Sequence, residues 1–170
     1  GKIEKMLNEI GDLYFTAPAS SRENYHYSFE GGLAKHSLNV LNCLIKLNDT
    51  FKMGFSSDSM ILAALFHDLG KACNVDSKTP HYETVTDKWK KEKRKMNYET
   101  TEDKVFFPNH QRSLYLLQKY EIDLNPEEYQ AILLNDGMYL QENRTYGMHE
   151  SDLALFLHIS DRIAVLKEQS

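Results

Sequence analysis

The sequence predicts an all-α protein, built as a helical bundle that is interrupted once in its second half. Six segments carry apolar residues three and four positions apart, the spacing that gives a helix one apolar face. Gly, Pro, Ser and Asn, which end or cap helices, lie between these segments. The expected helices span residues 2–14, 33–49, 58–72, 109–120, 126–138 and 151–167.

Capping residues mark the starts of two of these helices. Ser56 or Ser57 can cap the third helix, because a serine oxygen accepts a hydrogen bond from a free backbone N–H of the first turn. Asn125 can do the same for the fifth helix, and Pro126 suits its first position. These residues predict where the two helices begin.

The stretch 74–108 does not show the helical pattern. It is polar and highly charged, with partial alternation of apolar residues between Trp89 and Tyr98. The pattern predicts a small β-hairpin or a mobile lid within a single domain that covers residues 1–170. The stretch also contains a basic cluster, which is either a solvated surface or a region that attracts phosphate. The basic cluster consists of Lys88, Lys90, Lys91, Lys93, Arg94 and Lys95.

Composition and charge narrow the function classes. A hydrophobic content of 41% and a charged content of 26% are typical of a globular protein. No apolar run approaches the about 20 residues that cross a bilayer, and the first residues, GKIEKMLNEIGDLY, do not resemble a signal peptide. We therefore expect a cytoplasmic protein with no membrane partner. The net charge of -5 argues against nucleic acid as a partner.

Two cysteines, Cys43 and Cys73, lie inside apolar helical segments and are not spaced as a CxxC pair. A cytoplasmic compartment keeps such thiols reduced. We expect both to be free and to serve as small apolar residues.

Ionisable residues occupy positions where core residues are expected. His36 lies on the apolar stripe of the second helix, and the third helix, SMILAALFHDLGK, is apolar nearly all round until His67 and Asp68. Asp161 takes a position on the last helix where a leucine would normally lie. Because an unpaired buried carboxylate is costly, Asp161 needs a cation beside it.

That cation is either Arg162 or a metal ion held jointly with imidazoles. Taken alone, each polar residue has an ordinary explanation as a core group with a backbone hydrogen bond. Together, one His, a His-Asp pair and a distant Asp supply the nitrogen and oxygen ligands that suit Mn, Fe, Co, Ni or Zn. We therefore expect a divalent transition metal ion.

Three motifs also carry a family resemblance: GGLAKHSLNV, LAALFHDLGKA and LALFLHISDRIA. Their order, His, then His-Asp, then Asp, resembles the HD-domain superfamily of metal-dependent phosphohydrolases, over residues 20–166. The resemblance implies an HD-domain helical bundle. It further implies that Lys71, in HDLGK, helps to hold phosphate near the metal. The metal ligands that it implies are His36, His67, Asp68 and Asp161.

Two further segments are similar to the family. NHQRSLYLLQKY resembles the segment whose His approaches the substrate or a second metal, which gives that role to His110. EEYQAILLNDGMY resembles a segment in which many relatives carry a His where this chain has Asn135. Asn cannot replace an imidazole on a transition metal, so we expect one ion and not two, unless Asp136 compensates as a second-metal or substrate ligand.

Four other histidines receive weaker predictions. His26 resembles a substrate-binding or second-metal position in some relatives, and is otherwise an exposed loop residue. His158 lies one helical turn before Asp161, from where it can hydrogen bond to a ligand carboxylate. His81 and His149 are expected in loops.

The resemblance implies a hydrolase that cleaves a phosphate ester, in a nucleotide or another small phosphorylated metabolite, by means of a metal-activated water. Asp68 would orient the water, while Lys71 and His110 would stabilise charge on the phosphoryl group. One alternative is an HD module that binds a metal or nucleotide without turnover, since Asn135 replaces the expected His.

Two more function classes stay open. SRENYHYSFEGGLAKHS is similar to HD-type exoribonucleases, although their usual additional OB-like domain has no room here and the acidic charge argues against RNA. The last class is a helical bundle without a metal, whose polar core is satisfied by hydrogen bonds alone.

Overall fold

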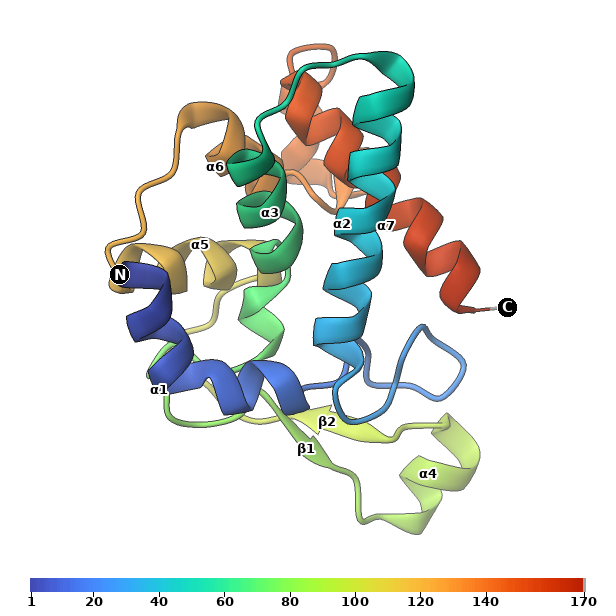
Figure 1. Cartoon of the computed structure of the whole chain (residues 1–170). Coiled ribbons are helices and arrows are strands. Elements are labelled where there is room, and N and C mark those ends of the chain that lie inside the picture. The colour runs from blue at the N-terminus through green and yellow to red at the C-terminus, as the bar shows by residue number, and fades with distance from the viewer. Residues whose placement is uncertain (170) are drawn as a thin grey trace.

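Helices make up most of the molecule, and a single small hairpin extends from them (Figure 1). The computed structural model describes residues 1–169. The elements are α1 (Lys2–Thr16), α2 (Gly32–Phe51), α3 (Ser57–Phe66), the 3₁₀ turn η1 (Leu69–Lys71), β1 (Tyr82–Thr84), α4 (Lys88–Arg94), β2 (Tyr98–Thr100), α5 (Asn109–Lys119), α6 (Pro126–Leu133), the 3₁₀ turns η2 (Gly137–Tyr139) and η3 (Gln141–Tyr146), and α7 (Asp152–Glu168). The predicted all-α bundle with a small hairpin is confirmed.

Helix α3 lies between two apolar clusters and contributes to both. Phe66 belongs to the cluster that α3 forms with α1 and α5, where Ile10 and Leu117 are fully buried. Ala63 belongs to the other cluster, which joins α3 to α2, α6 and α7 around residues such as Leu157. A helix with core on both sides is apolar nearly all round, as the sequence indicated. The His-Asp pair at its end is therefore delivered to the middle of the bundle.

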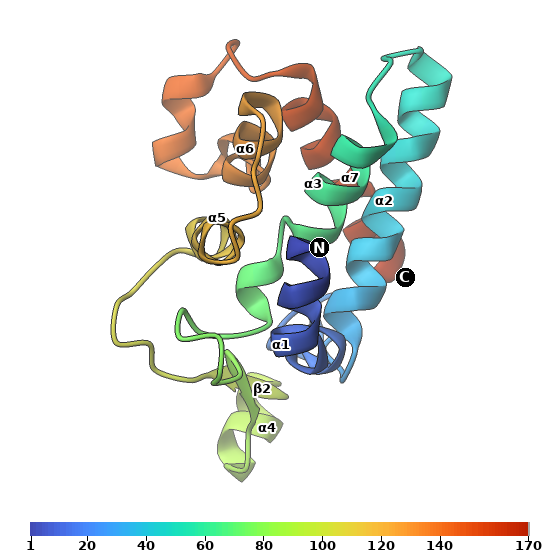
Figure 2. The same cartoon turned by 60° about the vertical axis from the view of Figure 1, so that its left-hand side comes forward.

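Helices α2 and α7 run beside each other, as Figures 1 and 2 both show, and they pack closely. Two glycines fix the start of α2. Gly31 adopts a φ of 81°, and a Cβ on Gly32 would lie 2.1 Å from the carbonyl oxygen of Tyr27. The loop before α2 thus packs tightly against its first turn, one turn before His36.

Two helices end earlier than the sequence predicted. The third helix, expected over 58–72, ends at Phe66, and Asp68 leaves the helical conformation with φ −107° and ψ 17°. The fifth, expected over 126–138, ends at Leu133. Both ends lead into 3₁₀ turns, η1 and η2. The shorter helices turn the chain so that residues 67–68 and 135–136 stand at helix ends. The predicted starts are confirmed, since Ser56 and Asn125 cap α3 and α6.

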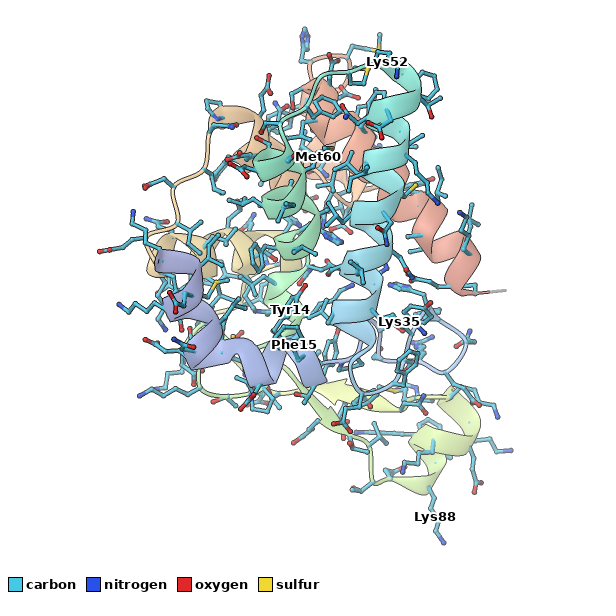
Figure 3. All side chains as sticks on the ribbon, in the orientation of Figure 1. Tyr14, Phe15, Lys35, Lys52, Met60 and Lys88 are labelled. Carbon is cyan, nitrogen blue, oxygen red and sulfur yellow. The ribbon has the colours of Figure 1, made fainter. Side chains whose placement is uncertain are left out.

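The stretch 74–108 forms an antiparallel hairpin, in which β1 pairs with β2 and α4 connects them. Both views place α4 at the opposite end of the molecule from α6, and Figure 3 shows Lys88 extending away from the helices. The hairpin is joined to the loop before α2, because Asn97 N donates to Ser21 O at 2.9 Å and Glu23 N to Lys95 O at 2.8 Å. The hairpin and this loop therefore form one structural unit.

Both cysteines are free, as predicted, with Cys73 buried and Cys43 half-buried. Within residues 1–169, no helix has the length and apolar character that a membrane span requires.

Candidate metal centre

The four residues expected to be metal ligands meet where α2, the end of α3 and α7 come together. His36 Nε2 lies 2.9 Å from Asp161 Oδ1, and His67 Nε2 lies 3.4 Å from Asp68 Oδ2. The other two His–Asp pairs, His36 with Asp68 and His67 with Asp161, are each 4.0 Å apart. Both histidines and Asp68 are buried, whereas the side chain of Asp161 is 20% exposed. The cluster is accessible from the side of Asp161.

Hydrogen bonds behind the two imidazoles decide which nitrogen faces the cluster. His67 Nδ1 lies 2.8 Å from the carbonyl oxygen of Ala64, so its Nδ1–H donates to that oxygen. His36 Nδ1 lies 2.8 Å from Glu168 Oε2. The Nε2 atoms of both rings are buried and have no hydrogen-bond partner among residues 1–169. Each histidine thus directs an unpartnered nitrogen toward the two aspartates.

These residues fit a divalent metal ion. A buried polar nitrogen with no partner is uncommon, and two that face the same pair of carboxylates indicate an absent ligand. Nitrogen and oxygen atoms that bind one ion at about 2.0–2.2 Å lie about 3–4 Å from one another. The four His–Asp separations, from 2.9 to 4.0 Å, fall in this range. Ligand atoms of His36, His67 and Asp161 lie within 4.8 Å of one another, and Asp68 adjoins this group through its contacts with the two histidines.

The electrostatics of the cluster favour ionised aspartates. Burial raises the pKa of Asp68, but Lys71 and His67 outweigh this effect and hold the pKa well below its usual range. Burial also raises the pKa of Asp161, and His36 and His67 lower it overall. Burial lowers the pKa of His36, yet the carboxylates of Asp161 and Glu168 outweigh burial and raise that pKa to about 9. Without a metal, His36 is therefore charged at neutral pH.

A cavity of about 260 Å³ opens over Asp68 and Asp161. Lys71 lines it and donates to Asp68 Oδ2 at 2.6 Å. Burial lowers the pKa of Lys71, but the Asp68 carboxylate raises it overall, so this lysine stays charged. Arg162, the alternative partner proposed for Asp161, also lines the cavity. The other described residues in its wall are Tyr25, His26, Asn135, Asp136, Val165 and Gln169.

His110 and the turn after α6 lie beside the cluster and not within it. His110 is 1% exposed, and its Nδ1 lies 3.5 Å from Asp136 Oδ2. Asn135 Nδ2 lies 3.5 Å from the carbonyl oxygen of His67, and Asn135 Oδ1 is buried without a partner in the described part of the chain. Neither His110 nor Asp136 belongs to a group of three metal-binding side chains among residues 1–169.

The hydrogen bond of His158 is to a backbone group and not to a proposed ligand carboxylate. Its Nδ1 lies 2.7 Å from the backbone carbonyl oxygen of Asn135, and within the described chain no ligand carboxylate bonds to the ring. The ring packs against Gly137, where a Cβ would lie 2.4 Å from it. His158 thus lines a separate cavity of about 310 Å³ between the end of α6 and α7.

Two loop histidines are more buried than the sequence indicated. His26 is half-buried, and its ring centroid lies 4.7 Å from that of His36. Burial, with the charges of Lys71 and His36, lowers the pKa of His26 to about 4. His81 is 8% exposed and contacts Asn74 Oδ1 at 2.9 Å. His149, in contrast, lies in an exposed turn, as expected.

Sequence reasoning missed two residues that hold the proposed ligands. Asn109 Nδ2 donates to Asp68 Oδ1 at 2.5 Å, and Glu168 accepts from His36. Glu168 lies two helical turns after Asp161, and this spacing could have placed both on one face. No pattern in the sequence signals Asn109, because its contact with Asp68 depends on how α5 packs against η1.

Comparison with known protein families identifies a match over most of the chain. A family model described as HD domain matches residues 33–166. This range begins on the second residue of α2 and contains all four residues of the cluster. Neither the curated proteins nor the solved structures that were searched include a match to the chain.

Proposed function

The chain belongs to the HD domain family, and on this premise we propose that it is a phosphohydrolase that uses a divalent metal ion. HD domains form a superfamily of metal-dependent phosphohydrolases. The observation that carries the proposal is the pair of buried, unpartnered Nε2 atoms on His36 and His67. Because these nitrogens face two ionised aspartates, the cluster has the composition and the charge of a metal site.

In this proposal His36, His67, Asp68 and Asp161 hold one divalent ion, of Mn, Fe, Co, Ni or Zn. Asn135, which lies beside His67, cannot serve as an imidazole ligand for a second ion. The bound ion would polarise a phosphoryl oxygen of the substrate and lower the pKa of a water molecule. The remaining chemistry falls to side chains of the chain itself.

Asp68 is held on both of its oxygens. Lys71 donates to Oδ2 at 2.6 Å and Asn109 to Oδ1 at 2.5 Å. The low pKa of Asp68 makes it a weak base, so we assign it the task of orienting a water by accepting a hydrogen bond. Lys71 neutralises Asp68 and at the same time presents positive charge to a phosphate in the cavity.

His110 remains the proposed third catalytic residue. It is buried behind Asp136, whose side chain is 50% exposed and lines the cavity. A phosphoryl group bound in the cavity would place its negatively charged oxygens near His110 and Asp136. His110 would then stabilise that charge, with Asp136 as its partner in the absence of substrate.

The cavity supports a small substrate. Its volume of about 260 Å³ is below the about 300–1,000 Å³ of sites that enclose drug-sized ligands. Lys71 and Arg162 supply positive charge, and Tyr25 supplies an aromatic face. This lining suits a phosphate ester of a nucleotide or another small metabolite.

A metal titration combined with a substrate panel tests the proposal. Protein stripped of metal would be titrated with Mn, Co, Ni and Zn, and each loaded form assayed on phosphomonoesters, nucleotides and cyclic nucleotides. We expect one equivalent of metal per chain and turnover of at least one substrate class, both lost in His67→Ala. Protein that binds no divalent metal stoichiometrically at neutral pH would contradict the proposal.

Asn135 favours a second candidate function, a module that binds a metal or nucleotide without turnover. The resemblance implies an imidazole ligand of a second metal at this position, and here the position holds a buried amide beside His67. The same panel separates the two functions, because stoichiometric metal binding without any turnover is the expected result for the binding module alone.

A further inference from the structure

His36 lies between two carboxylates of the same helix. Asp161 and Glu168 are seven residues apart on α7, so they share one face and lie about 10 Å apart along its axis. Asp161 Oδ1 is 2.9 Å from His36 Nε2, and Glu168 Oε2 is 2.8 Å from His36 Nδ1. Each nitrogen of the ring therefore meets one carboxylate of α7.

The Glu168 carboxylate is itself firmly held. Its side chain is 1% exposed, and Asn39 Nδ2 donates to Oε1 at 2.8 Å. Asn39 follows His36 by three residues on the same face of α2, and its Nδ2 is also 3.3 Å from Tyr27 Oη. A buried carboxylate is tolerated only when its oxygens are hydrogen bonded, and here both oxygens have a partner.

The two contacts of His36 differ in kind. The contact between Nδ1 and Glu168 has hydrogen-bond geometry, whereas Nε2 has no hydrogen-bond partner among residues 1–169 despite its distance of 2.9 Å from Asp161. A neutral imidazole carries one proton, and an acceptor aligned with Nδ1 keeps the proton there. In this neutral form, which the ring takes when an ion displaces the Nε2 proton, the lone pair on Nε2 faces the cluster.

We infer that Glu168 is a positioning residue of the metal centre: it accepts the Nδ1–H of His36 and so fixes the ring with Nε2 toward the ion. A carboxylate behind a metal-binding histidine acts in this way in many metal sites. The inference rests on the proposed function, because it needs the ion to lie on the Nε2 side.

A second set of ligand atoms lies on the other side of the His36 ring. His26, His36 and Glu168 also offer ligand atoms within 4.8 Å of one another, so an ion could lie on the Nδ1 side. Each side offers a group of three residues, and each group includes a histidine Nε2 without a partner among the described residues, from His26 on one side and His67 on the other. On the Nδ1 side, however, the contact between His36 and Glu168 has hydrogen-bond geometry, and Asn39 already occupies the other oxygen of Glu168. On the Nε2 side, Asp68 Oδ2 adds a further carboxylate, 4.0 Å from His36 Nε2 and 3.4 Å from His67 Nε2. The observations therefore favour the Nε2 side.

Zinc affinity of matched variants tests the inference. Metal-free wild type, Glu168→Ala and Glu168→Gln would be titrated against a chelating indicator. We expect Glu168→Ala to weaken zinc binding about 10- to 100-fold, and Glu168→Gln to weaken it less, because its amide oxygen still accepts the Nδ1–H. Glu128→Gln is the control, since Glu128 is a buried carboxylate that caps α6, where glutamine serves as well. This control should bind zinc as the wild type does.

Nitrogen NMR of the wild type gives a second, independent readout. In zinc-loaded protein with ¹⁵N-labelled histidine, His36 should carry its proton on Nδ1 and show the metal-bound shift on Nε2. This measurement decides the question even if Glu168→Ala does not fold, because it needs no variant.

The outcomes separate the two proposals. Wild type that binds zinc through Nδ1 of His36, or a folded Glu168→Ala that binds zinc within about threefold of the wild type, overturns the role of Glu168 and leaves the proposed function standing. Wild type that binds no zinc and no other divalent metal removes both.

Discussion

Metal binding should release a proton from His36. Without a metal, the carboxylates of Asp161 and Glu168 outweigh burial and raise the pKa of His36 to about 9, so the ring carries two protons at neutral pH. A metal ligand must offer an unprotonated nitrogen, and the ion must therefore displace the Nε2 proton. Asp68 and Asp161, whose pKa values are lowered, are already ionised and release nothing. The perturbation that reveals this competition is a change of pH.

The size of the effect follows from the pKa. With His36 at about 9, a solution at about pH 7 lies about two units below it, and each unit corresponds to 1.36 kcal/mol. Metal affinity at about pH 7 should therefore be about 100-fold, or about 2.7 kcal/mol, weaker than above about pH 9. Between these limits the affinity should rise about tenfold per pH unit, and above the pKa of His36 it should become constant.

Calorimetric titration with manganese in buffers of different ionisation enthalpy measures the released protons directly. We expect about one proton per bound ion at neutral pH and about none above the pKa of His36. His26 contributes no proton at neutral pH, because its pKa is lowered to about 4. An affinity that does not change between these two pH values, with no proton released, would refute the assignment of His36 as a ligand that is charged in the metal-free protein.

Three further results are expected. Asp161→Leu should abolish stoichiometric metal binding. Its melting temperature, measured by circular dichroism without metal, should stay close to that of the wild type. Metal binding retained in this variant would show that Asp161 is not a ligand. Gly70→Ala should lower the free energy of unfolding in urea by about 1–3 kcal/mol, because the added Cβ would lie 2.5 Å from the backbone oxygen of Asn109. It should also weaken metal binding, since the side chain of Asn109 holds Asp68. Unchanged values of both quantities would show that α5 can move freely. The free energy of unfolding of the metal-free protein should fall by about 3 kcal/mol as the pH rises from 6.5 to about 9. The reason is that His36 has a raised pKa and stabilises the fold only while it is charged. A melting temperature that stays level or increases over this range would contradict the predicted loss of stability.

The helical spacing of apolar residues in the sequence predicted much of the fold and part of the candidate site. His36 lies on a regular apolar stripe, so its inward orientation was readable from the sequence. The end of α3 was not readable, because a helix that is apolar on all sides has no stripe whose phase could show where it stops. The chain leaves the helix at His67 and Asp68 for reasons that lie in the packing of η1 against α5.

The spacing between His158 and Asp161 does not determine which group His158 contacts. Three residues correspond to about 300° of rotation, so His158 and Asp161 point about 60° apart around α7. That difference is enough for His158 to face the Asn135 carbonyl and not the cluster. Asn109 was missed for a related reason, since no local pattern encodes a contact between residues 41 positions apart in the chain.

Helix α7 contributes both Asp161 and Glu168, and it follows every other element along the described chain. During synthesis, α2 and α3 leave the ribosome long before α7. Until α7 follows, the proposed metal site lacks Asp161 and cannot form completely. If the cluster holds an ion as proposed, metal binding would be coupled to the docking of α7 on α2, and metal at a free concentration of about 1,000 times Kd would add about 4 kcal/mol to the stability of the assembled bundle. The bound ion would stabilise the fold only after α7 has docked.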